Sequence, residues 1–172
     1  PVLSIDNISV TDVTICSGLT NGGLVVTGSG GTGLREFSLD NVNYQPGGTF
    51  TDLAAGSYTV WIRDSNGCTV SSPATINEPA PVDALVVKTD ATYGNLGTIS
   101  ISNVSGGTAP YDYSIDGPAG PFTGTTSYTD LLPATYHVVV RDLNGCTYEE
   151  MVQILDVPPL DVAINLTHVS CF

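Results

Sequence analysis

Cationic side chains are scarce in this chain. Only 4 Lys and Arg residues stand against 17 Asp and Glu residues, which gives a net charge of −13 at pH 7. Nucleic-acid binding and docking on anionic lipid both depend on clustered cations, so this balance argues against both kinds of partner. The chain also lacks a run of about 18 apolar residues and a basic-then-apolar leader. We therefore expect neither a membrane span nor an export signal within it.

The residues that most often carry catalysis are scarce as well. The two histidines, His137 and His168, have no partner at metal-ligand spacing and no neighbouring nucleophile. Aspartates and glutamates are scattered over turns and expected strand ends, and no pair is marked out for acid–base work. We find no active site and predict that the protein is not an enzyme. Few charged residues (12%) and many Gly, Thr, Ser and Asn residues are typical of an extracellular β-rich surface.

One stretch of sequence occurs twice. Residues 53–69 (LAAGSYTVWIRDSNGCT) return 78 positions later as residues 131–147 (LLPATYHVVVRDLNGCT). In each copy apolar residues alternate from the tyrosine onward, and this period of two predicts a strand with one buried and one outer face. Trp61 and Val139 fall on the outer face. The Asp-x-Asn-Gly that follows predicts a type I turn with a glycine bulge, where the chain doubles back.

The repetition predicts the domain organisation. Residues 1–79 and 80–157 form two repeats, and residues 158–172 are the first strand of a third, so the chain is interpreted as a section of a longer array. Each repeat has about six or seven short strands with turn signals between them and no helical periodicity. We predict an all-β chain of tandem immunoglobulin-like antiparallel β-sandwiches arranged end to end. Tyr58 and Tyr136 stand where such sandwiches carry a corner tyrosine. The predicted core residues are Phe37, Leu39, Tyr58, Val60 and Ile62 in one repeat and Tyr113, Ile115, Tyr136, Val138 and Val140 in the other.

Several fixed spacings recur together in both repeats. Residues 106–116 read GGTAPYDYSID, and Leu-x-x-Gly-x-Tyr-x-Val-x-Val-x-Asp-x-Asn-Gly-Cys and then Glu-Pro follow in turn. This pattern resembles the SprB-type repeat of large Bacteroidetes surface adhesins over nearly the whole chain. Repeat 1 departs from it at Leu34-Arg35, where the family favours Pro-Tyr, and repeat 2 departs at Ala134 and at Tyr93. The resemblance implies a cell-surface protein of many tandem domains, exported by the type IX system and tied to gliding or adhesion.

We therefore expect structural spacer repeats of a large secreted adhesin on the bacterial cell surface, which hold a distal binding region away from the cell and bear mechanical load. The expected partners are neighbouring repeats of the same chain, and beyond them surface polysaccharide or other cells. Two alternatives stay open. The repeats are carbohydrate- or protein-binding modules with Trp61 as a ligand contact, or they are subunits of an extracellular filament.

No cofactor is expected, and calcium is the alternative to consider. Asp64-x-Asn66 and Asp142-x-Asn144 offer oxygen ligands for calcium. An EF-hand loop requires glycine at its sixth position, whereas here, counted from the aspartate, glycine stands at the fourth. A plain hairpin turn is the favoured interpretation. A junction site that draws on Glu78, Asp83 and Asp142 is the other. The favoured interpretation predicts that chelation with EDTA changes the melting temperature little.

The four cysteines, Cys16, Cys68, Cys146 and Cys171, are the disulfide candidates. Cys16 and Cys68 share a repeat, but an immunoglobulin-like order puts them at opposite poles, roughly 20 Å apart. A disulfide tolerates only about 7 Å between Cα atoms. Pairing of Cys16 with Cys146 satisfies the topology instead, and Cys68 and Cys171 then pair with repeats outside this chain. From the sequence both pairings of Cys16 stay open.

Overall fold

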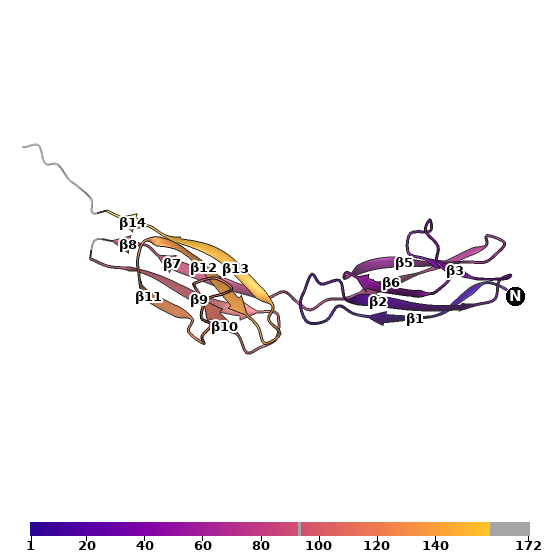
Figure 1. Cartoon of the computed structure of the whole chain (residues 1–172), viewed down its shortest axis with the longest axis horizontal. Helices are drawn as coiled ribbons and strands as arrows, with labels where there is room; N and C mark the ends of the chain where they lie inside the picture. The colour runs from indigo at the N-terminus through magenta and orange to yellow at the C-terminus, as the bar shows by residue number, and fades with distance from the viewer. Residues whose placement is uncertain (93, 159–172) are drawn as a thin grey trace, which may run out of the picture. The chain divides into compact units, whose positions relative to one another are not determined.

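The computed structural model describes residues 1–92 and 94–158, which fall into two compact units (Figure 1). Unit 1 comprises Pro1–Val82 together with two loops of the second repeat, Ser105–Tyr111 and Arg141–Thr147. Unit 2 comprises Asp83–Val104, Asp112–Val140 and the described residues from Tyr148 onward. The end-to-end arrangement of the repeats stays a prediction. The third repeat lies almost wholly outside the described residues.

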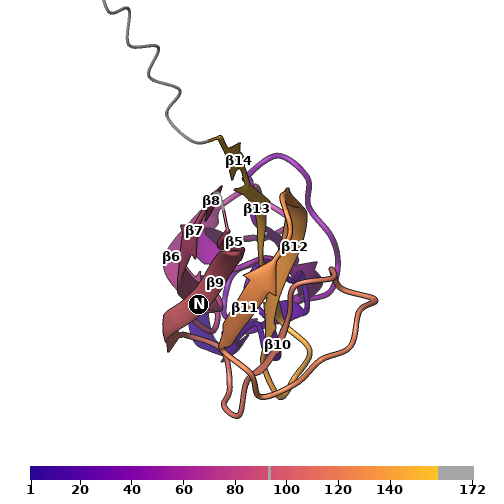
Figure 2. The ribbon, with the colours of Figure 1, turned by 90° about the vertical axis from the view of Figure 1, so that its left-hand side faces the viewer.

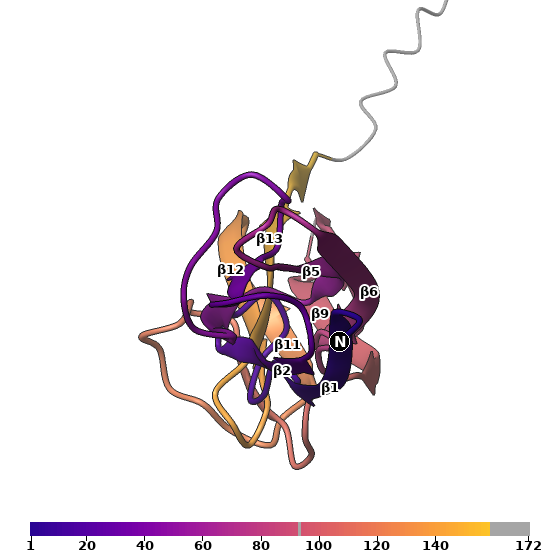
Figure 3. The ribbon, with the colours of Figure 1, turned by 90° about the vertical axis from the view of Figure 1, so that its right-hand side faces the viewer.

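Unit 1 is a sandwich of two antiparallel three-stranded sheets. One sheet has the order β1-β2-β4 and the other the order β3-β5-β6. Figure 3 shows β1 and β2 in one layer and β5 and β6 in the other. This order is the A-B-E and C-F-G arrangement of an immunoglobulin-like sandwich without its fourth strand. The strands are β1 (Ser4–Thr11), β2 (Gly22–Ser29), β3 (Glu36–Ser38), β4 (Thr49–Leu53), β5 (Gly56–Arg63) and β6 (Thr69–Ile76).

The core of unit 1 follows the predicted alternation. Val60 and Ile62 are fully buried, and Phe37 is 8% exposed. Leu39 and Tyr58 are partly buried and pack against the same cluster, which also holds Leu24 and Ile76. These apolar side chains come from both sheets, so their burial is what holds the two layers together.

Unit 2 repeats the plan with the orders β7-β9-β11 and β10-β12-β13, and adds a short parallel pair, β8 and β14. Val138 and Val140 are fully buried and Tyr113 is 9% exposed, while Ile115 and Tyr136 are half-buried. The strands are β7 (Asp83–Thr89), β8 (Ala91–Thr92), β9 (Gly97–Ser105), β10 (Asp112–Ser114), β11 (Ser127–Leu131), β12 (Ala134–Arg141), β13 (Thr147–Ile154) and β14 (Asp156–Val157). The prediction of all-β immunoglobulin-like antiparallel sandwiches is confirmed, and the described residues form no helix.

Two strands are shorter than the sequence pattern predicts. The β-branched residues between positions 3 and 15 predict a long, interrupted first strand, but β1 ends at Thr11, and the Thr14 N–H donates to Asn21 Oδ1 (3.2 Å) in the loop that follows. Residues 34–40 predict the third strand, but β3 covers only Glu36–Ser38. There the Asp40 carboxylate accepts the N–H groups of Val42 (2.9 Å) and Asn43 (2.7 Å), and these bonds turn the chain out of the sheet.

The placement of Val139 on an exposed outer face was wrong, because its side chain is fully buried. Ser114 of the neighbouring strand is also buried, at 1% exposed. The loop after β10, orange in Figure 2, approaches this face: the Gly117 N–H donates to the His137 carbonyl (2.9 Å), and Gly120 lies against Ser114. Strand alternation alone therefore does not decide whether a side chain meets water.

Candidate functional site

The repeated hairpin has the same backbone hydrogen bonds in both copies. In residues 64–68 the Gly67 N–H donates to the Asp64 carbonyl (2.9 Å), and the Asp64 N–H donates to the Cys68 carbonyl (3.0 Å). The second hairpin has the equivalent bonds at 3.1 and 3.0 Å. Gly67 and Gly145 adopt φ of 82° and 87°, where a side chain is disfavoured. The predicted turn with a glycine bulge is therefore confirmed in both copies.

A buried aspartate ties each hairpin to the glycine-rich turn before the third strand. Asp64 is 5% exposed, and its Oδ1 accepts the N–H groups of Asn66 (3.0 Å) and Cys68 (2.9 Å). Its Oδ2 accepts the Thr32 N–H at 2.9 Å. These bonds, the one from Thr32 first, hold the pKa of Asp64 below its usual value. We call this arrangement the aspartate clamp.

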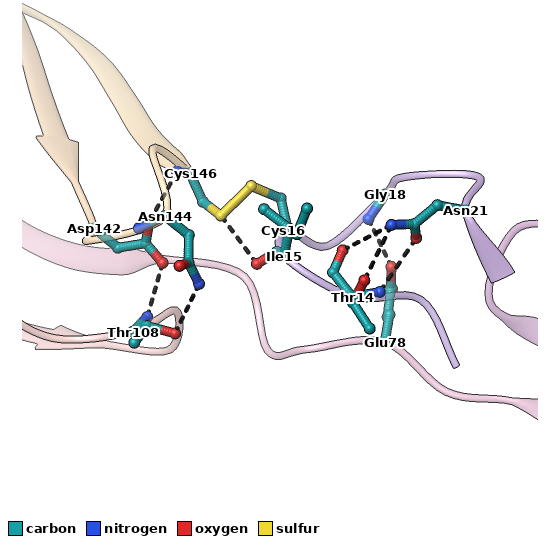
Figure 4. Close-up of a disulfide and its surroundings, with 10 residues drawn as sticks. All are labelled: Thr14, Ile15, Cys16, Gly18, Asn21, Glu78, Thr108, Asp142, Asn144 and Cys146. Atoms are coloured by element: carbon teal, nitrogen blue, oxygen red, sulfur yellow. Dashed lines mark hydrogen bonds between the residues drawn. A yellow bond between two sulfur atoms is a disulfide. The ribbon is translucent and has the colours of Figure 1, made fainter. Parts of the chain in front are cut away.

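Asp142, which is 4% exposed, forms the same clamp in the second copy. It accepts the N–H groups of Asn144 (2.9 Å), Cys146 (2.8 Å) and Thr108 (2.7 Å). Asn144 Nδ2 adds a bond to Thr108 Oγ1 at 3.0 Å (Figure 4). Each clamp carboxylate therefore already accepts three backbone donors, and its bonding is that of a structural turn.

The calcium candidates are placed as follows. Asp64 and Asn66 lie in one hairpin, and Asp142 and Asn144 in the other. Glu78 Oε2 accepts the Gly18 N–H at 2.6 Å, and Asp83 Oδ1 accepts the N–H of its neighbour Ala84 at 2.9 Å. Among the described residues no three His, Cys, Asp or Glu side chains form a group that could hold a metal ion. The response to EDTA stays a prediction.

Of the two cysteine pairings, the structure forms Cys16–Cys146, with 5.5 Å between the Cα atoms. Both cysteines belong to unit 1. Cys68 is free and exposed. Cys171 lies outside the described residues. The topological argument against Cys16–Cys68 was thus correct for Cys16.

The loop that presents Cys16 is held by its own hydrogen bonds (Figure 4). Asn21 Nδ2 donates to the Thr14 carbonyl (3.3 Å) and to Thr14 Oγ1 (3.1 Å), and Glu78 anchors Gly18. Ile15 has φ of 77°, a left-handed conformation that a β-branched residue rarely adopts. Nothing in the sequence pattern signalled this conformation. The loop of residues 14–21 is called the cysteine loop below.

Trp61 lies on the outer face of β5 as predicted, but it is half-buried. Its register partners are Ser38 of β3 and Ser71 of β6. Next to it, Arg63 pairs with Glu36 (Nη2 to Oε2, 2.7 Å), and the Tyr44 ring centroid lies 3.9 Å from the guanidinium carbon. The role of Tyr44 has no signal in the sequence, because the contact depends on how the loop after β3 folds back.

A hollow of about 380 Å³ opens beside this face, lined by Leu34, Arg35, Glu36, Pro46 and Ser65. Arg35 Nη1 donates to the Gly30 carbonyl at 3.1 Å. In repeat 2 the Tyr111 hydroxyl makes the equivalent bond to the Gly106 carbonyl at 2.6 Å. Repeat 1, which has Leu34-Arg35 in place of Pro-Tyr, therefore keeps a hydrogen bond to the glycine-rich turn. The donor is a guanidinium there and a phenol hydroxyl in repeat 2.

No protein-family model matches the chain, and no curated protein matches it. Among solved structures, an amphioxus IgVJ-C2 molecule is 13% identical, with 87% of this chain and 95% of that chain covered and a TM-score of 0.34. Domains 3–6 of protocadherin Gamma B2 are 14% identical (90% and 46% covered, TM-score 0.40). Domains 1–6 of the surface layer protein SbsC are 13% identical (94% and 28% covered, TM-score 0.29). The chain thus spans less than half the length of the protocadherin and surface-layer chains. Likenesses this weak say nothing about function. The described residues contain no helix long and apolar enough to cross a membrane.

Proposed function

We propose that the chain is a pair of structural spacer repeats from a secreted cell-surface adhesin of the SprB type, and that its work is to transmit mechanical load. The observation that supports this function most directly is the bond between Cys16 and Cys146, which are 130 positions apart. Extracellular proteins keep such bonds, because the cytosol reduces them. The acidic surface, with a net charge of −13, adds solubility and repulsion between neighbouring fibres.

The disulfide changes which residues carry tension. When the chain is pulled from its ends, force enters through the residues before Cys16, crosses the sulfur–sulfur bond and leaves through the residues after Cys146. The residues between the two cysteines lie on a closed covalent loop and carry no net tension. Most strands of both repeats are in that loop, whereas β1, β13 and β14 lie outside it. The bond therefore protects the folded interior of the repeats.

The effect on length is large. An extended residue spans about 3.5 Å, so 130 positions amount to roughly 450 Å of chain that the bond withholds from extension. Only the two segments outside the loop can lengthen, and β1 and β13 are already extended strands. A spacer built in this way keeps its reach under load, which is the property that presentation of a distal binding region requires.

Single-molecule stretching of the full chain, held by its two ends, tests the load path. In the oxidised protein we expect no release longer than the segments outside the loop allow. The Cys16→Ser/Cys146→Ser variant should release about 450 Å more. Cys68→Ser is the matched control, because it removes a cysteine that forms no disulfide in this structure. A long release from the oxidised protein would contradict the proposed function.

Surface location and export by the type IX system follow from the resemblance of the repeated motifs. Antibodies raised against residues 1–158 should label intact cells of the source bacterium, and loss of the type IX system should remove the label. Labelling that requires permeabilised cells would overturn the surface assignment.

The carbohydrate-binding alternative is less supported, because the half-buried Trp61 offers only part of its ring to a ligand. A glycan array probed with the full chain separates the two functions. Saturable binding that disappears in Trp61→Ala would replace the spacer function with recognition.

A further inference from the structure

Cys68 occupies the same place in the first hairpin as Cys146 occupies in the second. Asp64 and Asp142 accept the N–H groups of these cysteines at 2.9 and 2.8 Å, and both turns end on a glycine with positive φ. Cys146 is bonded to the cysteine loop, whereas Cys68 is free and exposed. The second copy therefore shows what a cysteine held in this hairpin engages.

The cysteine loop is also suited to act as a separate module. Its closing bonds run between Thr14 and Asn21, and its anchor is Glu78 of the same repeat. None of them involves the hairpin that supplies Cys146. Another repeat with this loop can thus present its cysteine before any hairpin reaches it, and pre-organisation of both sides lowers the entropic cost of joining them.

We propose that Cys68 forms a disulfide with the cysteine loop of another repeat placed ahead of residue 1, so that the hairpin of unit 1 is a covalent docking surface for a repeat of this same type. The inference rests on the tandem array of the proposed function. It assigns a disulfide partner to Cys68, whose thiol is free in this structure, and defines that partner by a cysteine at the position of Cys16.

Formation of the bond is an oxidation by a low-molecular-weight disulfide such as oxidised glutathione. The Cys68 thiolate attacks one sulfur of that molecule, forms a mixed disulfide and expels one thiolate. The thiolate of the partner loop then attacks the Cys68 sulfur and expels the second. Two protein thiols lose two electrons and two protons, and the oxidant becomes two glutathione thiols.

The second bond would alter the load path. Tension that arrives at Cys68 through the new disulfide can reach Cys146 along 78 positions of chain, or back along 52 positions to Cys16 and across the existing bond. The shorter path limits the extension. Overlapping disulfides would thus prevent each repeat from extending to its full contour length under tension.

An extended chain tests the proposal. Residues 1–79 are placed directly in front of the complete chain, because the Pro1 and Ala80 carbonyls accept equivalent bonds from Gly31 and Gly107, both at 3.0 Å. The leading Cys16 then precedes Cys68 by 79 − 16 + 68 = 131 positions, against 130 for the existing bond. Cys171 and the leading copy of Cys68 are changed to serine. After oxidation in a glutathione buffer, we expect non-reducing peptide mapping to join the leading Cys16 to Cys68 and to retain Cys16–Cys146.

In a matched variant the leading copy carries Cys16→Ser and Ser9→Cys, so that its only thiol lies at an exposed strand position outside the cysteine loop. We expect the equilibrium constant for bonding to Cys68 to be at least about tenfold lower in this variant. A Cys68 that stays open to alkylation in both proteins, or that bonds equally well to both, would overturn the proposal. Either result leaves the stretching experiment on the original chain unaffected, so failure of this joint and failure of the proposed function are distinguishable.

Discussion

The two repeats share the same hydrogen bonds between side chains and backbone at their strand ends, whereas the loops that connect their strands differ. The hydroxyls of Tyr58 and Tyr136 donate to the carbonyls of Ala54 and Leu132, both at 2.9 Å. Asp12 and Asp90 each accept a backbone N–H from the end of the last strand, from Asn77 and Leu155 respectively, both at 2.8 Å. With the aspartate clamps, these bonds fix the corners of each sandwich. The comparison shows that the frame is specified by a few polar residues at strand ends.

The loops after the third strand cover the outer face by different means. In repeat 1 the Asp40 carboxylate gathers the N–H groups of Asn43 and Val42, which lowers its pKa, and Tyr44 stacks on Arg63. In repeat 2 Gly117 lies against His137 and Gly120 against Ser114, and His137 Nε2 lies 3.0 Å from Glu149 Oε2. A loop can thus change its chemistry freely as long as the strand beneath it stays covered.

The largest difference between the repeats is the cysteine loop, and removal of its bond should have the largest effect. For a loop of 130 positions, Cys16→Ser/Cys146→Ser should lower the free energy of unfolding by about 5 kcal/mol. Urea unfolding followed by circular dichroism measures this change. Cys68→Ser should leave the midpoint unchanged. An unchanged midpoint in the double variant would mean that the bond does not restrict the unfolded chain.

Removal of either aspartate clamp tests whether the frame is equally important in both repeats. Asp64→Asn and Asp142→Asn keep the shape but place an amide where backbone N–H groups need an acceptor. Both should lower the melting temperature, by less than loss of the disulfide. The fluorescence of Trp61, the single tryptophan, reports the Asp64 variant directly. A neutral substitution in one copy would show that its clamp is redundant.

The same clamp predicts an acid dependence. The pKa of Asp64 is lowered in the folded protein, so its contribution is complete above the unfolded value of about 3.9 and is lost as the pH falls through the folded value. Stability followed by Trp61 fluorescence should therefore fall below about pH 4. Asp64→Asn should flatten this fall.

Features that depend on neighbouring residues were predictable from the sequence. The hairpins, the corner tyrosines and the alternating cores all follow from spacings of a few residues, and the second copy confirmed each spacing. The predicted topology argued against Cys16–Cys68, because distance along a strand can be estimated from residue number. Both pairings of Cys16 still stayed open from the sequence, because the strand order behind that argument was itself a prediction.

Features that depend on loop conformation were missed. The burial of Val139, the stacking of Tyr44 on Arg63 and the left-handed Ile15 each require a loop to fold back on a sheet or on itself. Periodicity within a strand carries no information about such a loop. Trp61 is half-buried, and its role as a ligand contact stays a prediction.

Substitution of the corner tyrosines should have a smaller effect on stability and should test whether the two units unfold separately. Tyr58→Phe and Tyr136→Phe each remove one hydroxyl bond and should cost about 1 kcal/mol of unfolding free energy. Only Tyr58→Phe should shift the transition seen by Trp61 fluorescence, because Tyr136 belongs to unit 2. Circular dichroism should register both. Equal shifts of the Trp61 transition would show that the two units unfold as one.

The smallest expected difference between the repeats is in their stability at high pH. The Tyr148 hydroxyl donates to Glu150 Oε2 at 2.7 Å, and this bond raises the pKa of Tyr148 to about 12. Burial also raises the pKa of Tyr128. The equivalent positions in repeat 1 are Val70 and Phe50, which do not titrate.

Because a raised pKa stabilises the protonated folded form, the contribution of Tyr148 is complete below the unfolded value of about 10 and is lost as the pH rises toward 12. We therefore expect unit 2 to lose stability between about pH 10 and pH 12 before unit 1 does. Unfolding at high pH should appear in circular dichroism before it appears in Trp61 fluorescence. Tyr148→Phe should delay the first transition, and a first transition reported by Trp61 would reverse the assignment.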